Sequence, residues 1–501
     1  MRRLYTLIFI STGLICFHQN PAQGQSYADI ARIMSQQEIH GTARIQGIGG
    51  TNTALGGDIS AISGNPAGLG FYNSSEFSVS PGYLLINNTS SYLGSSLKDE
   101  YSNFYLANGG VVIHKPSQRS KGFKGGSFGI GTSRIANFQN HISYQGSNTV
   151  EDFIDYAVVE ANDQGPDAYD NPELLPELPF LAFQTTLIDR FFNVNTPGDT
   201  TLFYDRNIYD IFDPNQIAFP SDEFPTLQQE VITTKGGHYQ TNFSYGANFA
   251  DRFYIGAALG INTLRLDQER IYRESPTDAD LTELTLIDDR QLEGTGINGT
   301  LGIIIRPVNV FTLGVSYTSP TFYEMRDESY LFMSADFNTG ILSDEVIFLP
   351  LRYNLRTPGR LNGGAALFLD KLGFISADVE WVDYGSAELT SDEFDFSETN
   401  QEVNTYGSVL NYKVGAELRI KVLRLRAGYS FQEDPLESAD GIDRSRESLT
   451  AGLGLRFEKF FVDASYVRSN YNTSVSPYPR ASTALIENIS ENAVLTLGFK
   501  F

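Results

Sequence analysis

Apolar and polar residues alternate with a period of two along much of this 501-residue chain. The last eleven residues, Glu491 to Phe501, show the pattern most clearly. In an extended strand one face would carry Ala493, Leu495, Leu497, Phe499 and Phe501, and the other Asn492, Val494, Thr496, Gly498 and Lys500. An amphipathic strand that finishes on an aromatic residue is typical of the closing strand of an outer-membrane β-barrel.

Segments of the same kind recur from Glu76 onward and give fourteen candidate strands. They cover residues 76–87, 103–114, 127–145, 238–249, 253–271, 288–306, 309–330, 353–369, 373–389, 405–420, 423–432, 447–457, 460–475 and 491–501. From the third strand on, long polar loops and tight turns alternate as connections. Short periplasmic turns and long outer loops characterise a single-chain outer-membrane barrel, whereas a sandwich or propeller lacks this asymmetry. The sequence therefore predicts an all-β fold: a transmembrane 14-stranded antiparallel β-barrel.

The sequence predicts a secretory signal peptide over residues 1–24. Arg2 and Arg3 precede an apolar stretch, Leu4 to Phe17, that is too short to span a bilayer. Small residues at Ala22 and Gly24 predict cleavage before Gln25. The single cysteine of the chain, Cys16, would be removed with the signal, so the mature protein would have no disulfide. Together with the barrel pattern, the signal predicts an integral protein of the outer membrane of a Gram-negative bacterium.

Residues 25–75 differ from the strands that follow. Gly41 to Gly70 holds nine glycines in thirty residues, so this segment cannot form a core of its own. A fourteen-stranded lumen is too wide for side chains to fill and needs either water or a plug. We predict that residues 25–75 are a plug, or hatch, inside a barrel of residues 76–501. A flexible periplasmic linker is the alternative, but the segment carries Ile45, Ile48, Leu55, Ile59, Ile62 and Leu69.

Composition narrows the possible partners. The net charge of −24 argues against nucleic-acid binding, which needs a basic face. The acidic residues are concentrated, since Gly146 to Thr234 contains 17 Asp or Glu and two Arg. The mean hydropathy of −0.21 does not oppose membrane insertion, because barrel residues alternate between lipid and lumen. The predicted partners are outer-membrane lipid and lipopolysaccharide, and the predicted state is a monomer.

The predicted plug carries a recognisable motif. The sequence GTARIQGIGGTNTALGGDISAISGNPAGLGF at 41–71 resembles the hatch of the FadL/TodX family of outer-membrane transporters for hydrophobic compounds such as long-chain fatty acids. The likeness continues in LRTPGRLNGGAALF (355–368), ADVEWVDYGS (377–386), LRAGYSFQEDPL (425–436) and VDASYVR (462–468). It independently implies fourteen strands. It also implies passive inward transport, in which outer loops capture the ligand, an apolar pocket holds it and a gap in the wall releases it sideways.

Three sets of residues are candidates for the functional site. The hatch motif is Asn65, Pro66, Ala67 and Gly68, which would close a turn and let the backbone approach the wall. Arg419, Arg424, Arg426 and Arg456 lie on predicted lumen faces, where they would dock the plug or bind an anionic head group. Leu178, Phe180, Leu181 and Phe183 form an apolar island in the acidic loop 146–237. That island would be either an outer docking patch for a greasy ligand or the core of the loop itself.

Other chemistry has no support in the sequence. His40, His114, His141 and His238 share no ligand spacing, and no hydrolase or phosphate-binding motif occurs. We therefore predict no metal, no cofactor and no enzymatic activity. The predicted function is an outer-membrane channel for passive uptake of a hydrophobic small molecule. The alternative is a FadL-like barrel that docks exported proteins at the cell surface as part of a secretion system.

Overall fold

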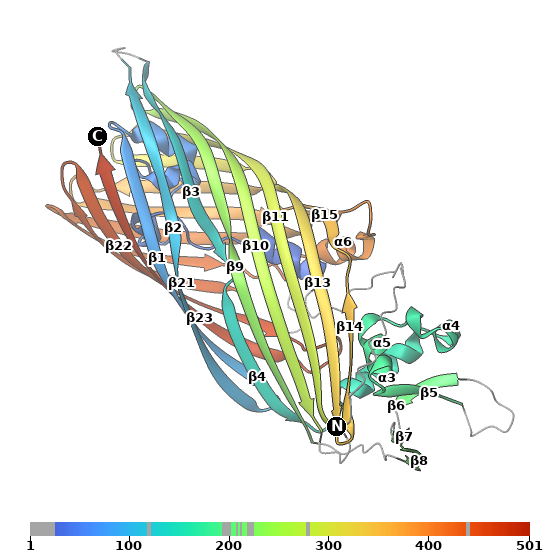
Figure 1. Ribbon diagram of the computed structural model, residues 1–501. Coiled ribbons are helices and arrows are strands. Elements are labelled where there is room, and N and C mark those ends of the chain that lie inside the picture. The colour runs from blue at the N-terminus through green and yellow to red at the C-terminus, as the bar shows by residue number, and fades with distance from the viewer. Residues whose placement is uncertain are drawn as a thin grey trace, which may run out of the picture.

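The computed structural model describes residues 26–117, 122–192, 202–206, 209–210, 213–217, 225–276, 281–436 and 441–501 (Figure 1). The predicted signal peptide lies outside these ranges. Over the described residues the chain forms a closed antiparallel barrel of fourteen strands, as predicted. The barrel closes where the first strand, β1 (Glu76–Tyr92), pairs with the last, β23 (Ala484–Lys500).

Several barrel strands are interrupted and continue as a second segment. The barrel strands between β1 and β23 are β2 (Ser95–Pro116), β3 (Phe123–Asn137) with β4 (Asn140–Asn148), β9 (Thr226–Phe249), β10 (Phe253–Ser275), β11 (Leu281–Val308), β12 (Phe311–Thr318) with β13 (Phe322–Phe337), β14 (Gly340–Ile347) with β15 (Leu351–Arg356) and β16 (Arg360–Phe368), β17 (Gly373–Asp383) with β18 (Glu388–Thr390), β19 (Ser408–Ile420), β20 (Leu423–Gln432), β21 (Arg446–Arg456) and β22 (Phe460–Val475). Several strands extend further on the outer side than predicted. For example, β9 starts at Thr226 rather than 238. Its outer part carries polar residues on both faces, so the sequence pattern there indicated a loop.

The facing of the closing strand agrees with the prediction. Leu495, Leu497 and Phe499 point outward and are exposed, whereas Val494 and Thr496 are buried in the lumen. Outward apolar side chains continue around the barrel, as in Leu259, Leu301, Ile303, Leu313, Val315, Leu449 and Leu453. Within the described residues, no helix is long and apolar enough to cross a bilayer.

Replacing Leu301 by Arg is expected to destabilise the folded barrel by about 2–4 kcal/mol if the side chain lies near the bilayer midplane. Leu301 lies on β11 in this outward band and is 65% exposed, so the charge would enter lipid. Urea titration of the barrel folded into vesicles would measure the loss.

The control for Leu301→Arg is Thr234→Arg, because Thr234 lines a lumen cavity with room for the side chain. Thr496 would be a poor control, since its Oγ1 accepts a hydrogen bond from the plug, 2.8 Å from the backbone nitrogen of Ala43. Equal destabilisation by Leu301→Arg and Thr234→Arg would contradict the assignment of the two faces.

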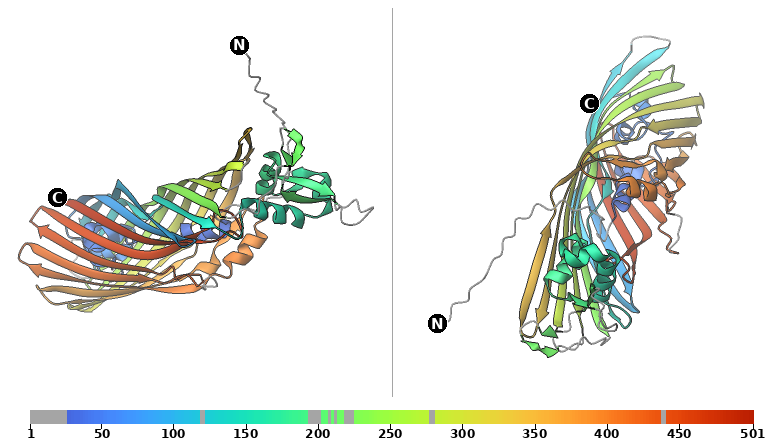
Figure 2. Two further views of the ribbon diagram at one scale, coloured as in Figure 1. Left: turned by 90° about the horizontal axis from the view of Figure 1, so that it is seen from below. Right: turned by 90° about the vertical axis from the view of Figure 1, so that its right-hand side faces the viewer.

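Residues 26–75 lie inside the barrel and form the plug (Figure 2). Its elements are α1 (Tyr27–Ser35), α2 (Ala43–Gln46) and the 3-10 helices η1 (Ile59–Ile62) and η2 (Pro66–Phe71). Each begins at a capping side chain that accepts a backbone N–H, namely Ser26, Thr42, Asp58 and Asn65. The six apolar residues that argued against a linker are all buried against the wall or the plug itself.

The long acidic connection between β4 and β9 forms a small outer unit beside β13 and β14 (Figure 1). Its described elements are α3 (Phe153–Asp163), α4 (Pro166–Asp170), η3 (Pro172–Leu174), α5 (Glu177–Gln184), β5 (Ile188–Phe192), β6 (Leu202–Arg206), β7 (Tyr209–Asp210) and β8 (Asp213–Ile217). A second outer connection carries η4 (Tyr384–Ser386) and α6 (Ser397–Val403). Both connections bring helices to the outer end of the barrel, above the plug.

Candidate functional site

The plug rests on a belt of glycines that face the lumen. Successive strands place glycines opposite each other, as in the pairs Gly246↔Gly256 and Gly256↔Gly302 of β9, β10 and β11. A Cβ atom on Gly256 would overlap the backbone of Pro66, and one on Gly415 would overlap Ile48. The glycine belt consists of Gly452, where a Cβ would lie 3.3 Å from Gly47 of the plug, and of seven glycines where a Cβ would overlap a plug atom: Gly129, Gly246, Gly256, Gly302, Gly314, Gly415 and Gly428. These glycines let the plug backbone lie directly on the wall.

The belt was missed in the sequence analysis, although the sequence contains a signal for it. The glycines fall on the lumen side of the alternation, a few residues from a short turn, on many consecutive strands. A glycine weakens a strand unless a close approach of another backbone requires it. Recurrence of lumen-facing glycines at one level of the barrel therefore indicates a seat for a plug.

The hatch motif fastens η2 to this seat. The Asn65 side-chain amide donates to the carbonyl oxygen of Thr53 at 2.7 Å and lies 3.4 Å from the carbonyl oxygens of Ile303 and Val315 on the wall. Its Oδ1 accepts from the backbone N–H of Ala67 at 3.1 Å. Pro66 begins η2, and Gly68 is so close to Ala61 that a side chain there would clash. The contacts of the motif are thus with the plug and the wall, which supports its role in closing the hatch.

Three of the four predicted arginines meet in one buried network. Arg426 lies between Glu417 and Asp463, at 2.8 Å from each carboxylate. Arg419 contacts the other oxygen of Glu417 at 2.9 Å, and Arg456 contacts Asp463 at 2.7 Å. Because buried charges need partners, the two carboxylates Glu417 and Asp463 stabilise the three guanidinium groups, which they share across β19 to β22.

The plug joins this network, and the fourth arginine lies outside it. Arg44 of α2 reaches Glu417 at 3.6 Å and Asp58 of the plug at 3.7 Å. Arg424 instead donates to the carbonyl oxygens of Lys421 and Leu423, at 2.7 and 2.9 Å, in the turn between β19 and β20. This geometry favours plug docking over anion binding for these arginines, because carboxylates of the chain already occupy the guanidinium groups of the network.

A cavity of about 420 Å³ lies in the lumen above the plug. This volume falls in the range that holds small-molecule ligands. Its walls come from α1, the junction of β3 and β4, β9, β10, the region of α6, and the outer ends of β20 to β22. The cavity is therefore lined by both the plug and the barrel.

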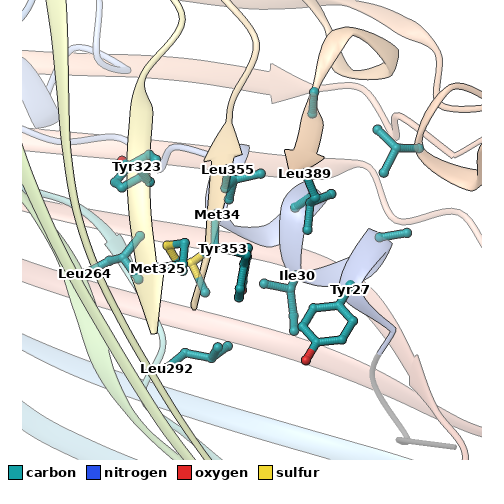
Figure 3. Packing of buried hydrophobic residues seen from close by; sticks show 14 of the residues in the cluster. Tyr27, Ile30, Met34, Leu264, Leu292, Tyr323, Met325, Tyr353, Leu355 and Leu389 are labelled. Carbon is teal, nitrogen blue, oxygen red and sulfur yellow. The ribbon is translucent and has the colours of Figure 1, made fainter. Parts of the chain in front are cut away.

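Helix α1 separates this cavity from an apolar region of the lumen. Tyr27, Ile30 and Met34 pack against the wall residues Leu264, Leu292, Tyr323, Met325, Tyr353, Leu355 and Leu389 (Figure 3). The other face of the helix, with Asp29, Arg32, Ile33 and Gln36, lines the cavity. The amphipathic pattern of α1 thus fills the apolar part of the upper lumen and leaves the cavity beside it.

The barrel wall changes its bonding next to the cavity. β2 and β3 pair from Pro116↔Gly125 as far as Asn108↔Ser133. Beyond that point β3 and then β4 stay paired with β9, but the backbone ladder to β2 has ended. Side chains bridge β2 and β4 there. The Asp99 carboxylate accepts from the N–H and hydroxyl of Ser143, at 2.7 and 2.9 Å, and the Tyr101 hydroxyl donates to Gln139 at 2.7 Å. Side chains, which rearrange more readily than a strand ladder, thus hold this part of the wall.

The apolar island of the outer unit is largely buried. Leu178 and Leu181 of α5 are 2% and 0% exposed, and they pack in a cluster with Phe153, Met333 and other residues of the unit and the barrel. Phe180 and Phe183 are partly buried against the same cluster. This placement favours the second sequence-based interpretation, in which the island forms the core of the loop.

No cluster of three or more His, Cys, Asp or Glu side chains with metal-binding geometry occurs in the part of the chain that the structure describes.

No protein-family model matches the sequence, and no curated protein matches it. Solved structures do. The toluene transporter TodX of Pseudomonas putida superposes with a TM-score of 0.53 at 14% identity, over 92% of this chain and 99% of that chain. A FadL homologue of Pseudomonas aeruginosa superposes with a TM-score of 0.56 at 12% identity, over 93% of this chain and 100% of that chain. The toluene transporter TbuX of Ralstonia pickettii superposes with a TM-score of 0.52 at 14% identity, over 92% of this chain and 98% of that chain. The resemblance seen in the sequence is thus confirmed at the level of the fold, and the chain has the plugged fourteen-stranded barrel of the FadL/TodX type.

Proposed function

We propose that the protein is an outer-membrane channel that passes hydrophobic small molecules inward without an energy source. The solved structures of the same fold include toluene transporters, which supports this class of function. Those structures give no support to the alternative of a protein-docking component of a secretion system. The observation that carries the proposal is the position of the cavity, which adjoins the part of the wall where β2 and β4 are joined by side chains.

The route follows from this arrangement. The glycine belt and the hatch motif close the direct path along the barrel axis toward the periplasm. Ala136, Phe138 and Gln139, at the junction of β3 and β4, line the cavity and also belong to the weakly joined wall. A hydrophobic ligand would therefore leave the cavity sideways into the bilayer, where its apolar surface stays out of water.

A disulfide that joins β2 to β4 is expected to stop this transport. Asp99 and Ser143 are in contact across the wall, and the predicted mature chain has no cysteine. Cells carrying the Asp99→Cys/Ser143→Cys double variant should take up the hydrophobic dye N-phenyl-1-naphthylamine only at the background rate after oxidation. A reductant should restore the uptake, which fluorescence follows as the dye enters the membrane.

The matched control links two strands that already pair. Ser448 on β21 and Ser469 on β22 are register partners with hydroxyl oxygens 2.7 Å apart. A Ser448→Cys/Ser469→Cys disulfide adds a cross-link without closing the proposed exit, so uptake should continue. Undiminished uptake with a fully formed 99–143 disulfide would contradict the lateral route.

A further inference from the structure

We infer that the preferred ligand of the cavity is an amphiphile with an uncharged, hydrogen-bonding head group, rather than a hydrocarbon or a free fatty acid. This inference rests on the proposed function, because it assumes that the cavity holds the transported molecule. It is carried by the side chains that line the cavity and by the way their charges are paired.

Neutral amides dominate the polar lining. Nine carboxamide side chains reach the cavity: Gln36, Gln37, Asn137, Gln139, Asn140, Gln268, Asn411, Gln432 and Asn472. Several of these amides already bond within the protein; that of Asn411, for example, donates to Glu380 and accepts from the backbone N–H of Glu433. Because a carboxamide has two N–H donors and an oxygen with two lone pairs, it can also bond a hydroxyl or amide group of an uncharged head. A pure hydrocarbon in the same place would remove water from these amides without replacing its hydrogen bonds, which is unfavourable.

The formal charge of the lining cancels, because the lining holds four arginines and four carboxylates. Two of the arginines form ion pairs within the lining. Arg32 pairs with Asp29 at 3.0 Å, and Arg446 pairs with Glu38 at 2.9 Å.

The other two arginines are also engaged. Arg270 binds Glu230 at 2.8 Å, and Arg444 donates to the Ser474 hydroxyl at 2.7 Å. An anionic head group would have to displace an acceptor that belongs to the protein. A neutral head group needs no such displacement, so it is favoured over a carboxylate.

The apolar lining shows where the tail would lie. The β3 to β10 side of the barrel contributes four of the nine amides but also five of the eight apolar lining residues, namely Ala136, Phe138, Ile142, Ile232 and Leu266. Ile142 and Ile232 are direct register partners on β4 and β9. On the opposite side, the outer ends of β20 to β22 contribute Gln432, Arg446, Tyr471, Asn472 and Thr473. The tail would thus point to the proposed exit and the head to β20 to β22.

Calorimetric titration of the full mature protein in amphipol tests the head-group preference with ligands of equal chain length. We expect 1-decanoyl glycerol to bind at least about tenfold more tightly than decanoate at pH 8, and decane to bind more weakly than both. Decanoate that binds as tightly as 1-decanoyl glycerol would overturn the inference and leave the proposed function standing. If none of the three binds, the proposed function fails and the inference falls with it.

A conservative variant tests the position of the head. Tyr471→Phe keeps the ring under the Arg446 guanidinium, 4.0 Å from the ring centre, and removes one hydroxyl from the cavity. The affinity for 1-decanoyl glycerol should fall about 2- to 12-fold, the range expected for one hydrogen bond, while that for decane stays the same. The control Tyr412→Phe alters an outward-facing tyrosine of β19 and should change neither the affinity for 1-decanoyl glycerol nor that for decane. An unchanged affinity in Tyr471→Phe would overturn the placement of the head.

Discussion

Deleting residues 26–72 is expected to convert a closed barrel into an open pore. The strand pairing, including the closure between β1 and β23, lies entirely within residues 76–500, so the shortened chain should still insert and fold. The lumen of fourteen strands is too wide for its own side chains to fill. Planar-bilayer recordings should therefore change from a closed baseline to a steady ionic conductance.

The same deletion should abolish saturable binding of hydrophobic ligands. Asp29, Arg32, Ile33 and Gln36 to Glu38 form part of the cavity wall, so the cavity loses one side with the plug. Circular dichroism and heat-dependent gel mobility provide the control, because both should still report a folded barrel. If a folded, shortened barrel conducted no more than the intact protein, the plug would not be what closes the pore.

A single side chain on the glycine belt is expected to unseat the plug without disturbing the barrel. A Cβ at position 256 would stand in the backbone of Pro66 and Ala67, which cannot move aside as a flexible side chain can. Overpacking of this kind typically costs about 1–3 kcal/mol, and here it would destabilise the contact between η2 and the wall. In Gly256→Leu, bilayer recordings should show frequent openings, and a protease added from the periplasmic side should cleave the plug.

Gly363 provides the matched control for Gly256→Leu. It also lies in a barrel strand, β16, but a Cβ there would meet open space. Gly363→Leu should therefore remain closed and resist the protease. If the two variants behaved alike, leucine would be acting through the strand backbone rather than through the seat of the plug.

The barrel could be predicted from the sequence because its signal is local. Alternation with a period of two assigns each residue of β23 to lipid or lumen without knowledge of any other strand. The order of short turns and long loops then sets the topology. The outer ends of the strands were less predictable. In β9, residues 226–237 carry polar side chains on both faces, and only pairing with β10 and β4 keeps them extended.

The site could be predicted only in part, because its contacts are not local. Sequence alternation placed Arg426 and Arg456 in the lumen, but it did not reveal that they share Asp463. It also gave no indication that Arg44 of the plug would approach Glu417, 373 positions away in the chain. The cavity and the glycine belt were missed for the same reason, since each is assembled from residues of many strands.

The contacts of the plug impose an order on the biogenesis of the protein. The backbone nitrogen of Ala43 bonds to Thr496, that of Gly49 to Thr450 and that of Asn52 to Asp378. The segment that leaves the ribosome early thus has its binding partners in strands that are made late. It remains without its native contacts until β23 has been synthesised and the sheet closes around it. Barrel closure and plug docking are consequently coupled late steps in the folding of the chain, and the glycine-rich plug segment must stay soluble until then.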